Sequence, residues 1–246
     1  MADRSEEPSV NDETDPLSDT ESVDAPTLVE DLLLLLFQPD SGTIAGETTL
    51  YSVLAAAVLA DLALAEQVQA EVTPTGSLKV TAVEGNAPDD EILRGAWEYV
   101  AGRSRGVQGV LAAVGPPLRA QVLDRLVDRG EIRREKRTVL GLFESTALVD
   151  AHTGRRAMVL SQIRDVLVDG AEPTPRVAAL AALLWGSGTL PQFDRDIPWT
   201  SPVIARAQEL QQGNWGAGAA AEAVTRTMAA IVASSVIVAI AAQPRT

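Results

Sequence analysis

Residues 119–149 read RAQVLDRLVDRGEIRREKRTVLGLFESTALV, and they predict a helix that is followed directly by a hairpin of two strands. Val122, Leu123 and Leu126 recur at helical spacing, so they share one face of an amphipathic helix. Gly130 follows, and glycine adopts the left-handed conformation that ends many helices at little cost. The segment beyond it has no helical stripe and ends in an apolar run. We therefore expect the helix to end at Gly130 and a basic strand to begin there.

This stretch is basic in a protein that is otherwise acidic. Residues 119–137 carry seven basic and four acidic side chains, whereas the whole chain has a net charge of −14. Such a local excess predicts a surface for an anionic partner, although a solvated face would show the same pattern. The candidates are Arg119, a basic surface of Arg125, Arg129, Arg133, Arg134 and Arg137, and an apolar hairpin tip of Leu140, Leu142 and Phe143.

The composition of the 246 residues favours a mainly α fold. Apolar residues make up 46% of the chain and aromatic residues only 4%, so small and straight side chains would let helices pack closely. We expect a helical domain around a buried C-terminal helix, with short β-hairpins. The chain has no cysteine and no signal-like N-terminus, which predicts a cytoplasmic protein without disulfides.

Two segments are set apart by their composition. Residues 1–26 contain nine acidic side chains and one arginine, and we expect them to form a disordered acidic tail ahead of a single helical domain at 27–243. The second segment is 217–242. The uncharged run that begins in it, 227–243, is shorter than the ~20 residues that a membrane span needs. It predicts a helix buried among the others.

Several local signals place the other elements. Thr27 and Glu30 form a capping-box pattern at the start of the apolar run 32–37. Residues 67–83 read as a hairpin around a Pro-Thr-Gly turn. Residues 107–114 predict a short helix of their own, and the proline pair at 116–117 would then open the central helix.

No metalloprotease, thiol or phosphate-loop motif is present. The chain lacks HExxH, CxxC and phosphate-loop patterns, and its single histidine, His152, lies in a polar turn without a candidate partner. We therefore expect a non-enzymatic protein with no catalytic residue, no cofactor and no metal site.

Five segments in order carry a resemblance to a known family. They are TLVEDLLLLLFQPDSG (27–42), VLAAAVLADLALAEQVQ (53–69), LVDRGEIRREKRTVLGLF (126–143), VLVDGAEPTPRVAALAALL (166–184) and the alanine-rich C-terminal segment. Together they resemble the Golgi phosphoprotein 3 family, and its bacterial, actinomycete-like members most.

The resemblance implies a peripheral membrane protein that binds phosphatidylinositol 4-phosphate. It also implies a protruding hairpin that serves membrane insertion or self-association, and a membrane-protein client, which in eukaryotic members is a Golgi glycosyltransferase. The family's headgroup pocket has one tryptophan and three arginines. Arg119 matches one of these arginines, whereas Gly46, Ala55 and Pro116 replace the tryptophan and the other two arginines.

The residues alone support weak, reversible binding to anionic lipid at the inner face of the cell membrane. Basic side chains near an anionic leaflet contribute about 1 kcal/mol each. A lipid-independent scaffold that forms homo-oligomers through the hairpin is the alternative. A helix, a glycine turn and a basic hairpin also describe a winged-helix nucleic-acid binder, which the net charge and the interleaved acids disfavour.

Overall fold

The computed structural model describes residues 25–139, 143–213 and 226–234, with side chains described outside 137–145. Its helices with complete bounds are α1 (Leu28–Leu36), α2 (Leu50–Leu64), α3 (Glu91–Val100), α4 (Val107–Asp128), α5 (Arg155–Leu167), α6 (Pro175–Gly186), the short 3-10 helix η1 (Leu190–Phe193) and α7 (Ser201–Gln211). Its strands are β1 (Phe37–Gln38), β2 (Thr43–Ile44), β3 (Val68–Val72), β4 (Leu78–Ala82), β5 (Arg105–Gly106), β6 (Ile132–Val139) and β7 (Phe143–Asp150).

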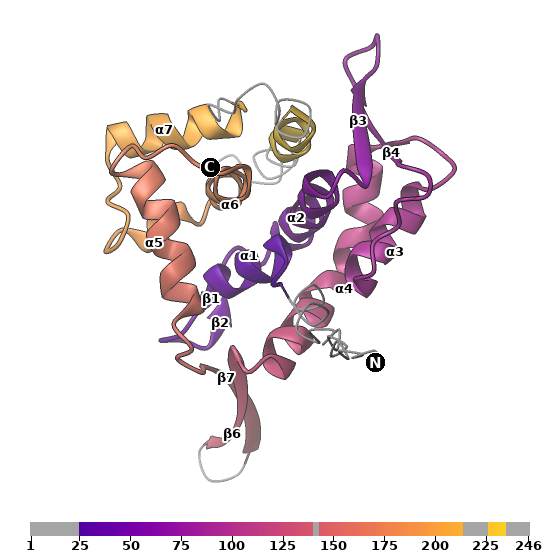
Figure 1. Ribbon diagram of the computed structural model, residues 1–246. Helices are drawn as coiled ribbons and strands as arrows, with labels where there is room; N and C mark the ends of the chain where they lie inside the picture. The colour runs from indigo at the N-terminus through magenta and orange to yellow at the C-terminus, as the bar shows by residue number, and fades with distance from the viewer. Residues whose placement is uncertain (1–24, 140–142, 214–225, 235–246) are drawn as a thin grey trace, which may run out of the picture.

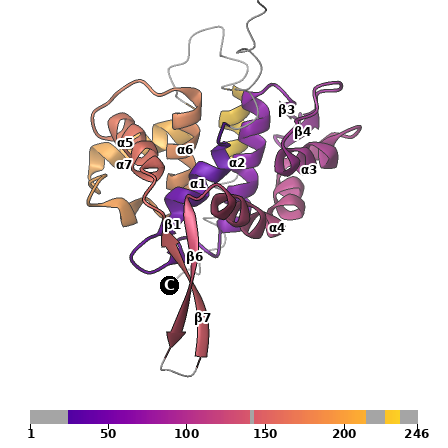
Figure 2. The same cartoon turned by 60° about the horizontal axis from the view of Figure 1, so that its bottom comes forward.

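Helices α1 and α2 lie in the middle of the molecule (Figure 1). Helices α5, α6 and α7 lie on one side of them, and α3 and α4 lie on the other, as a second view confirms (Figure 2). Every residue of α1 is buried, and so are all but two residues of α2. A helix that is apolar on all faces is stable only when neighbours cover all of it, which accounts for this central position. The mainly α architecture with short antiparallel hairpins is thus confirmed.

The start of α1 follows the predicted capping box. The Thr27 hydroxyl accepts a hydrogen bond from the backbone N–H of Glu30, whose carboxylate accepts one from the N–H of Thr27. This exchange satisfies donors that a helix start otherwise leaves unpaired. The run after it is buried as predicted, and its last residue, Phe37, pairs with Ile44 in a small hairpin.

The junction between α4 and β6 also has the predicted geometry. Gly130 has φ +73°, and the N–H groups of Gly130 and Glu131 donate to the carbonyl oxygens of Val127 and Leu126. This pair of bonds is the Schellman motif, in which a left-handed residue closes the helix end. Ile132 then enters the core with no exposed surface, so the first residue of β6 fixes where the hairpin leaves the body.

The prediction of two separate helices around the proline pair is wrong. Residues 107–128 form the single helix α4, with Pro116 and Pro117 in its interior. Each proline removes one backbone hydrogen bond, which costs a helix about 3 kcal/mol when nothing compensates. Buried side chains on both halves of α4, including Leu111, Leu118 and Val122, pack into the same core and stabilise the two halves as one continuous helix.

Two hairpins project from the helical body (Figure 1). The predicted hairpin at 67–83 is confirmed as β3–β4, and β5, which was not predicted, extends it to three strands. The second hairpin, β6–β7, pairs eight residues with eight, from Ile132 with Asp150 to Val139 with Phe143. It forms a sheet of its own.

Two predicted segments fall largely on residues outside the described ones. The acidic tail at 1–26 is described only from residue 25 onward. Of the C-terminal segment, residues 226–234 are described; all of them are helical, and Met228, Ile231 and Val232 are buried in the common core. A central role for the whole segment 217–242 stays a prediction.

Candidate functional site

Arg119 lies on the surface of α4 and is paired with an acidic residue. Its Nε and Nη2 both donate to Oε1 of Glu47, at 3.2 and 3.0 Å, and the two side chains are 46% and 55% exposed. Glu47 belongs to the loop between β2 and α2, so the pair joins positions 72 residues apart. Arg119 is therefore accessible, but one edge of its guanidinium is already engaged.

The residues around this pair range from completely buried to exposed. Tyr51, at the start of α2, is 40% exposed and packs against Gly115, one helical turn before Arg119. Ala55 is completely buried in α2, whereas Pro116 is exposed on α4. An arginine at position 55 would therefore need a buried partner, whereas alanine fits the core there.

Two of the predicted basic-surface residues hold the fold together. Arg125 is ion-paired with Asp90 at the start of α3. Nε of Arg129 lies 2.6 Å from Oε1 of Glu30, a side chain with no exposed surface. Both arginines are mostly buried, so they tie α4 to α3 and to α1 respectively.

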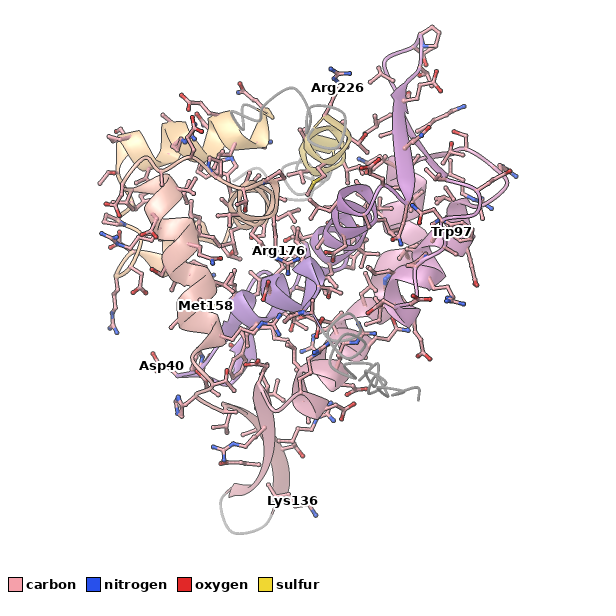
Figure 3. All side chains as sticks on the ribbon, viewed as in Figure 1. Asp40, Trp97, Lys136, Met158, Arg176 and Arg226 are labelled. Atoms are coloured by element: carbon pink, nitrogen blue, oxygen red, sulfur yellow. The ribbon has the colours of Figure 1, made fainter. Side chains whose placement is uncertain are left out.

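The basic side chains that the hairpin exposes lie on β6. Arg133, Arg134 and Lys136 are all exposed; Arg134 is ion-paired with Asp124 of α4, and no ion pair of Arg133 or Lys136 occurs among the described residues. Because successive side chains of a strand alternate, Arg133 and Lys136 lie on opposite faces of the hairpin. Lys136 lies near its far end (Figure 3). The side chains of Arg137 and Phe143, and all of Leu140 and Leu142, lie outside the described residues.

A buried cluster of charges surrounds the start of α1. Nη2 of Arg155 lies 2.6 Å from Oδ1 of Asp31, and Nη2 of Arg176 lies 2.6 Å from Oδ2 of the same carboxylate. Arg176 also reaches Asp61 at 3.7 Å, and Arg155 reaches Glu131 at 3.8 Å. We call these five residues the α1 charge cluster. It joins α1 to α2, to the first turns of α5 and α6, and to the residue just before β6; Arg176, labelled in Figure 3, is 33% exposed.

The sequence did not predict this cluster. Its one signal is Asp61, the only charge inside the apolar helix α2. Asp61 accepts hydrogen bonds from the N–H groups of Leu28 and Val29, at 2.8 and 3.1 Å. A side chain from another helix thus caps the first turn of α1, which no pattern of neighbouring residues could indicate.

Burial raises the pKa of Asp61 to about 7, because the interior disfavours its charged form more than the two N–H donors and Arg176 favour it. Between the unfolded pKa near 3.8 and the folded pKa, the folded protein binds the extra proton. This residue therefore stabilises the fold at low pH, and its contribution is lost as the pH rises through about 7.

Asp61→Asn should remove this pH dependence. The free energy of unfolding of the original protein, minus that of the variant, is expected to fall by about 1.4 kcal/mol per pH unit between pH 5 and 7 and to level off above. Urea unfolding at a series of pH values measures it. A difference that stays constant over this range would contradict the assignment, and subtracting the variant cancels the titration of the other carboxyl groups.

A groove of about 440 Å³ lies between α3 and α4. It is lined by Glu91, Ile92, Gln121, Asp124, Arg125 and Asp128.

In the described part of the chain, no group of three or more His, Asp or Glu side chains could hold a metal ion. A search of the same residues finds no helix that is long and apolar enough to cross a membrane.

Comparison with protein families now decides what kind of domain this is. The family model described as Golgi phosphoprotein 3 (GPP34) matches residues 28–227, which run from the first residue of α1 to the described C-terminal helix. The chain belongs to the Golgi phosphoprotein 3 family. The family expectation from the sequence is thereby confirmed. A comparison with curated proteins gave no match. The helix–hairpin junction at Gly130 and the basic strand β6 both lie inside the matched region of this Golgi phosphoprotein 3 domain.

Proposed function

We propose that this protein binds anionic lipid headgroups and docks reversibly on the cytoplasmic leaflet of a membrane. Membership of the Golgi phosphoprotein 3 family supports a protein of this kind. The observation that carries the proposal is the basic strand β6, whose exposed Arg133, Arg134 and Lys136 lie on a hairpin that projects from the body (Figure 1). Arg119 would add a donor for one phosphate group, as in a pocket for phosphatidylinositol 4-phosphate.

The charges suit weak binding to a membrane. Each exposed basic side chain near an anionic leaflet contributes about 1 kcal/mol, and this attraction fades beyond a Debye length of ~8 Å at physiological salt. A projecting hairpin can bring such side chains within that distance while the acidic remainder of the protein stays farther away. Apolar side chains at its tip, Leu140, Leu142 and Phe143, would add burial in the interface. A docked domain of this kind could hold a membrane-protein client.

Arg133 and Lys136 are the two cations of β6 that have no ion pair within the described part of the chain, and replacing both should weaken docking. Arg133→Gln with Lys136→Gln is expected to lower the affinity for vesicles of phosphatidylcholine and phosphatidylserine by about tenfold to thirtyfold. Vesicle co-sedimentation measures it, with phosphatidylcholine alone as the lipid control. Added salt should weaken the binding of the original protein more than that of the variant, because the variant binds through fewer charges.

A matched variant tests whether the location of the charge matters. Arg103→Gln with Arg195→Gln removes the same charge from exposed turns outside β6, and it should leave vesicle binding nearly unchanged. An equal loss in both double variants would show that only net charge acts, and no binding of the original protein would overturn the proposal. Light scattering on the same samples checks the alternative of a scaffold that self-associates through the hairpin.

A further inference from the structure

We propose that Glu47 is a built-in competitor for Arg119 and thereby sets the affinity of this site for a phosphomonoester headgroup. The inference rests on the proposed function, because it assigns Arg119 to a lipid phosphate. It adds Glu47 as a residue that lowers the affinity of Arg119 for phosphate. Pairing with Glu47 would also explain why this exposed arginine does not bind anions of every kind.

The contact occupies the part of the guanidinium that a phosphate would use. Nε and Nη2 form the edge of arginine that grips two oxygens of a carboxylate or a phosphate. In this protein both groups donate to a single oxygen, Oε1 of Glu47. A headgroup that approaches along this edge must displace that carboxylate.

The loop that carries Glu47 is held in place. Gly46 has φ +72°, and a Cβ atom there would lie 3.0 Å from Cγ2 of Thr189, so the loop packs closely against the segment after α6. The N–H and the hydroxyl of Thr49 both donate to the carbonyl oxygen of Gly46, at 2.9 and 3.2 Å. These bonds pin the backbone on both sides of Glu47 and keep its carboxylate in reach of Arg119.

The competition is weak enough to be overcome. An ion pair between two half-exposed side chains stabilises a protein only slightly. A phosphomonoester carries about −1.5 to −2 charges at pH 7, against −1 for a carboxylate. It can therefore displace Glu47 from Arg119. The free energy gained on binding is then reduced by the loss of the Glu47–Arg119 pair and by repulsion from the nearby carboxylate.

Glu47→Gln should remove this competition. The affinity for vesicles of phosphatidylcholine with phosphatidylinositol 4-phosphate is expected to rise about two- to fivefold, the range that corresponds to one exposed ion pair. The gain should vanish when Glu47→Gln is made together with Arg119→Gln and compared with Arg119→Gln alone. Vesicle co-sedimentation measures all four proteins, and thermal unfolding checks that each one is folded.

Asp169→Asn provides the matched control. Asp169 pairs with Arg164 at 2.7 Å, the two side chains are 52% and 43% exposed, and the pair lies at the end of α5. This variant makes the same change in net charge, and it should leave vesicle binding unchanged. Equal gains in Glu47→Gln and Asp169→Asn would overturn the role of Glu47 and leave the proposed lipid binding intact.

The remaining outcomes are also decisive. Binding by Glu47→Gln where the original protein shows none would support the competition. No binding by any of the variants would overturn both this inference and the proposed function. Titration with inorganic phosphate separates the two sources of a phosphate: if Glu47→Gln binds free phosphate but not the vesicles, the assignment to a lipid headgroup is overturned.

Discussion

Asp31→Asn is expected to lower the free energy of unfolding by about 3–5 kcal/mol. Asp31 is the shared partner of Arg155 and Arg176, each of which approaches one of its oxygens to 2.6 Å. Removing one member of a buried ion pair leaves the other charge in the interior without compensation. Arg176 would keep its hydrogen bond to the carbonyl oxygen of Pro26, at 2.8 Å. The charged contacts that remain, with Glu131 and Asp61, are 3.8 and 3.7 Å long and would compensate only in part.

Urea unfolding at pH 7, followed by circular dichroism, measures this loss, and Asp124→Asn is its control. Asp124 pairs with Arg134 at the surface, where the side chains are 58% and 45% exposed. Loss of such an exposed pair changes stability by less than about 1 kcal/mol. If the two variants lost equal stability, the α1 charge cluster would have no special part in holding α1.

Gly115→Ala should lower the free energy of unfolding by about 1–3 kcal/mol, although alanine has the higher helix propensity. A Cβ atom at this position would lie 2.9 Å from the carbonyl carbon of Tyr51 and closer still to its oxygen. The obstacle is backbone, so α2 and α4 must move apart, and overpacking of a well-packed core typically costs about 1–3 kcal/mol. In an open helix the same change would gain about 1 kcal/mol.

Gly95→Ala is the matched control for this second prediction. Gly95 lies in the middle of α3, and a Cβ atom there would meet no atom within 4 Å. We expect it to gain about 0.5–1 kcal/mol, because alanine loses less conformational freedom on folding. Opposite signs for the two variants, measured by thermal or urea unfolding, would verify the close approach of α2 and α4; a gain at both positions would refute it.

Part of the candidate site could be predicted because its signals are local. The arginines of β6 are adjacent in sequence, and a two-stranded hairpin that projects from the body exposes the side chains on both of its faces. The roles of Arg125 and Arg129 could not be predicted, because their partners, Asp90 and Glu30, come from other helices. The role of Glu47 could not be predicted either, because its side chain reaches Arg119 only when α2 and α4 are packed together.

By itself the sequence determined the mainly α class, the buried apolar helix α1 and its capping box, and the left-handed turn at Gly130. These features depend on interactions within a few residues, where propensity and periodicity act. Only the tertiary structure decided that α4 continues through its proline pair, that Asp61 caps α1, and that Arg119 is held by Glu47. Contacts of this kind join residues up to 145 positions apart in the α1 charge cluster, as between Asp31 and Arg176, and they form only when the buried helices bring those positions together.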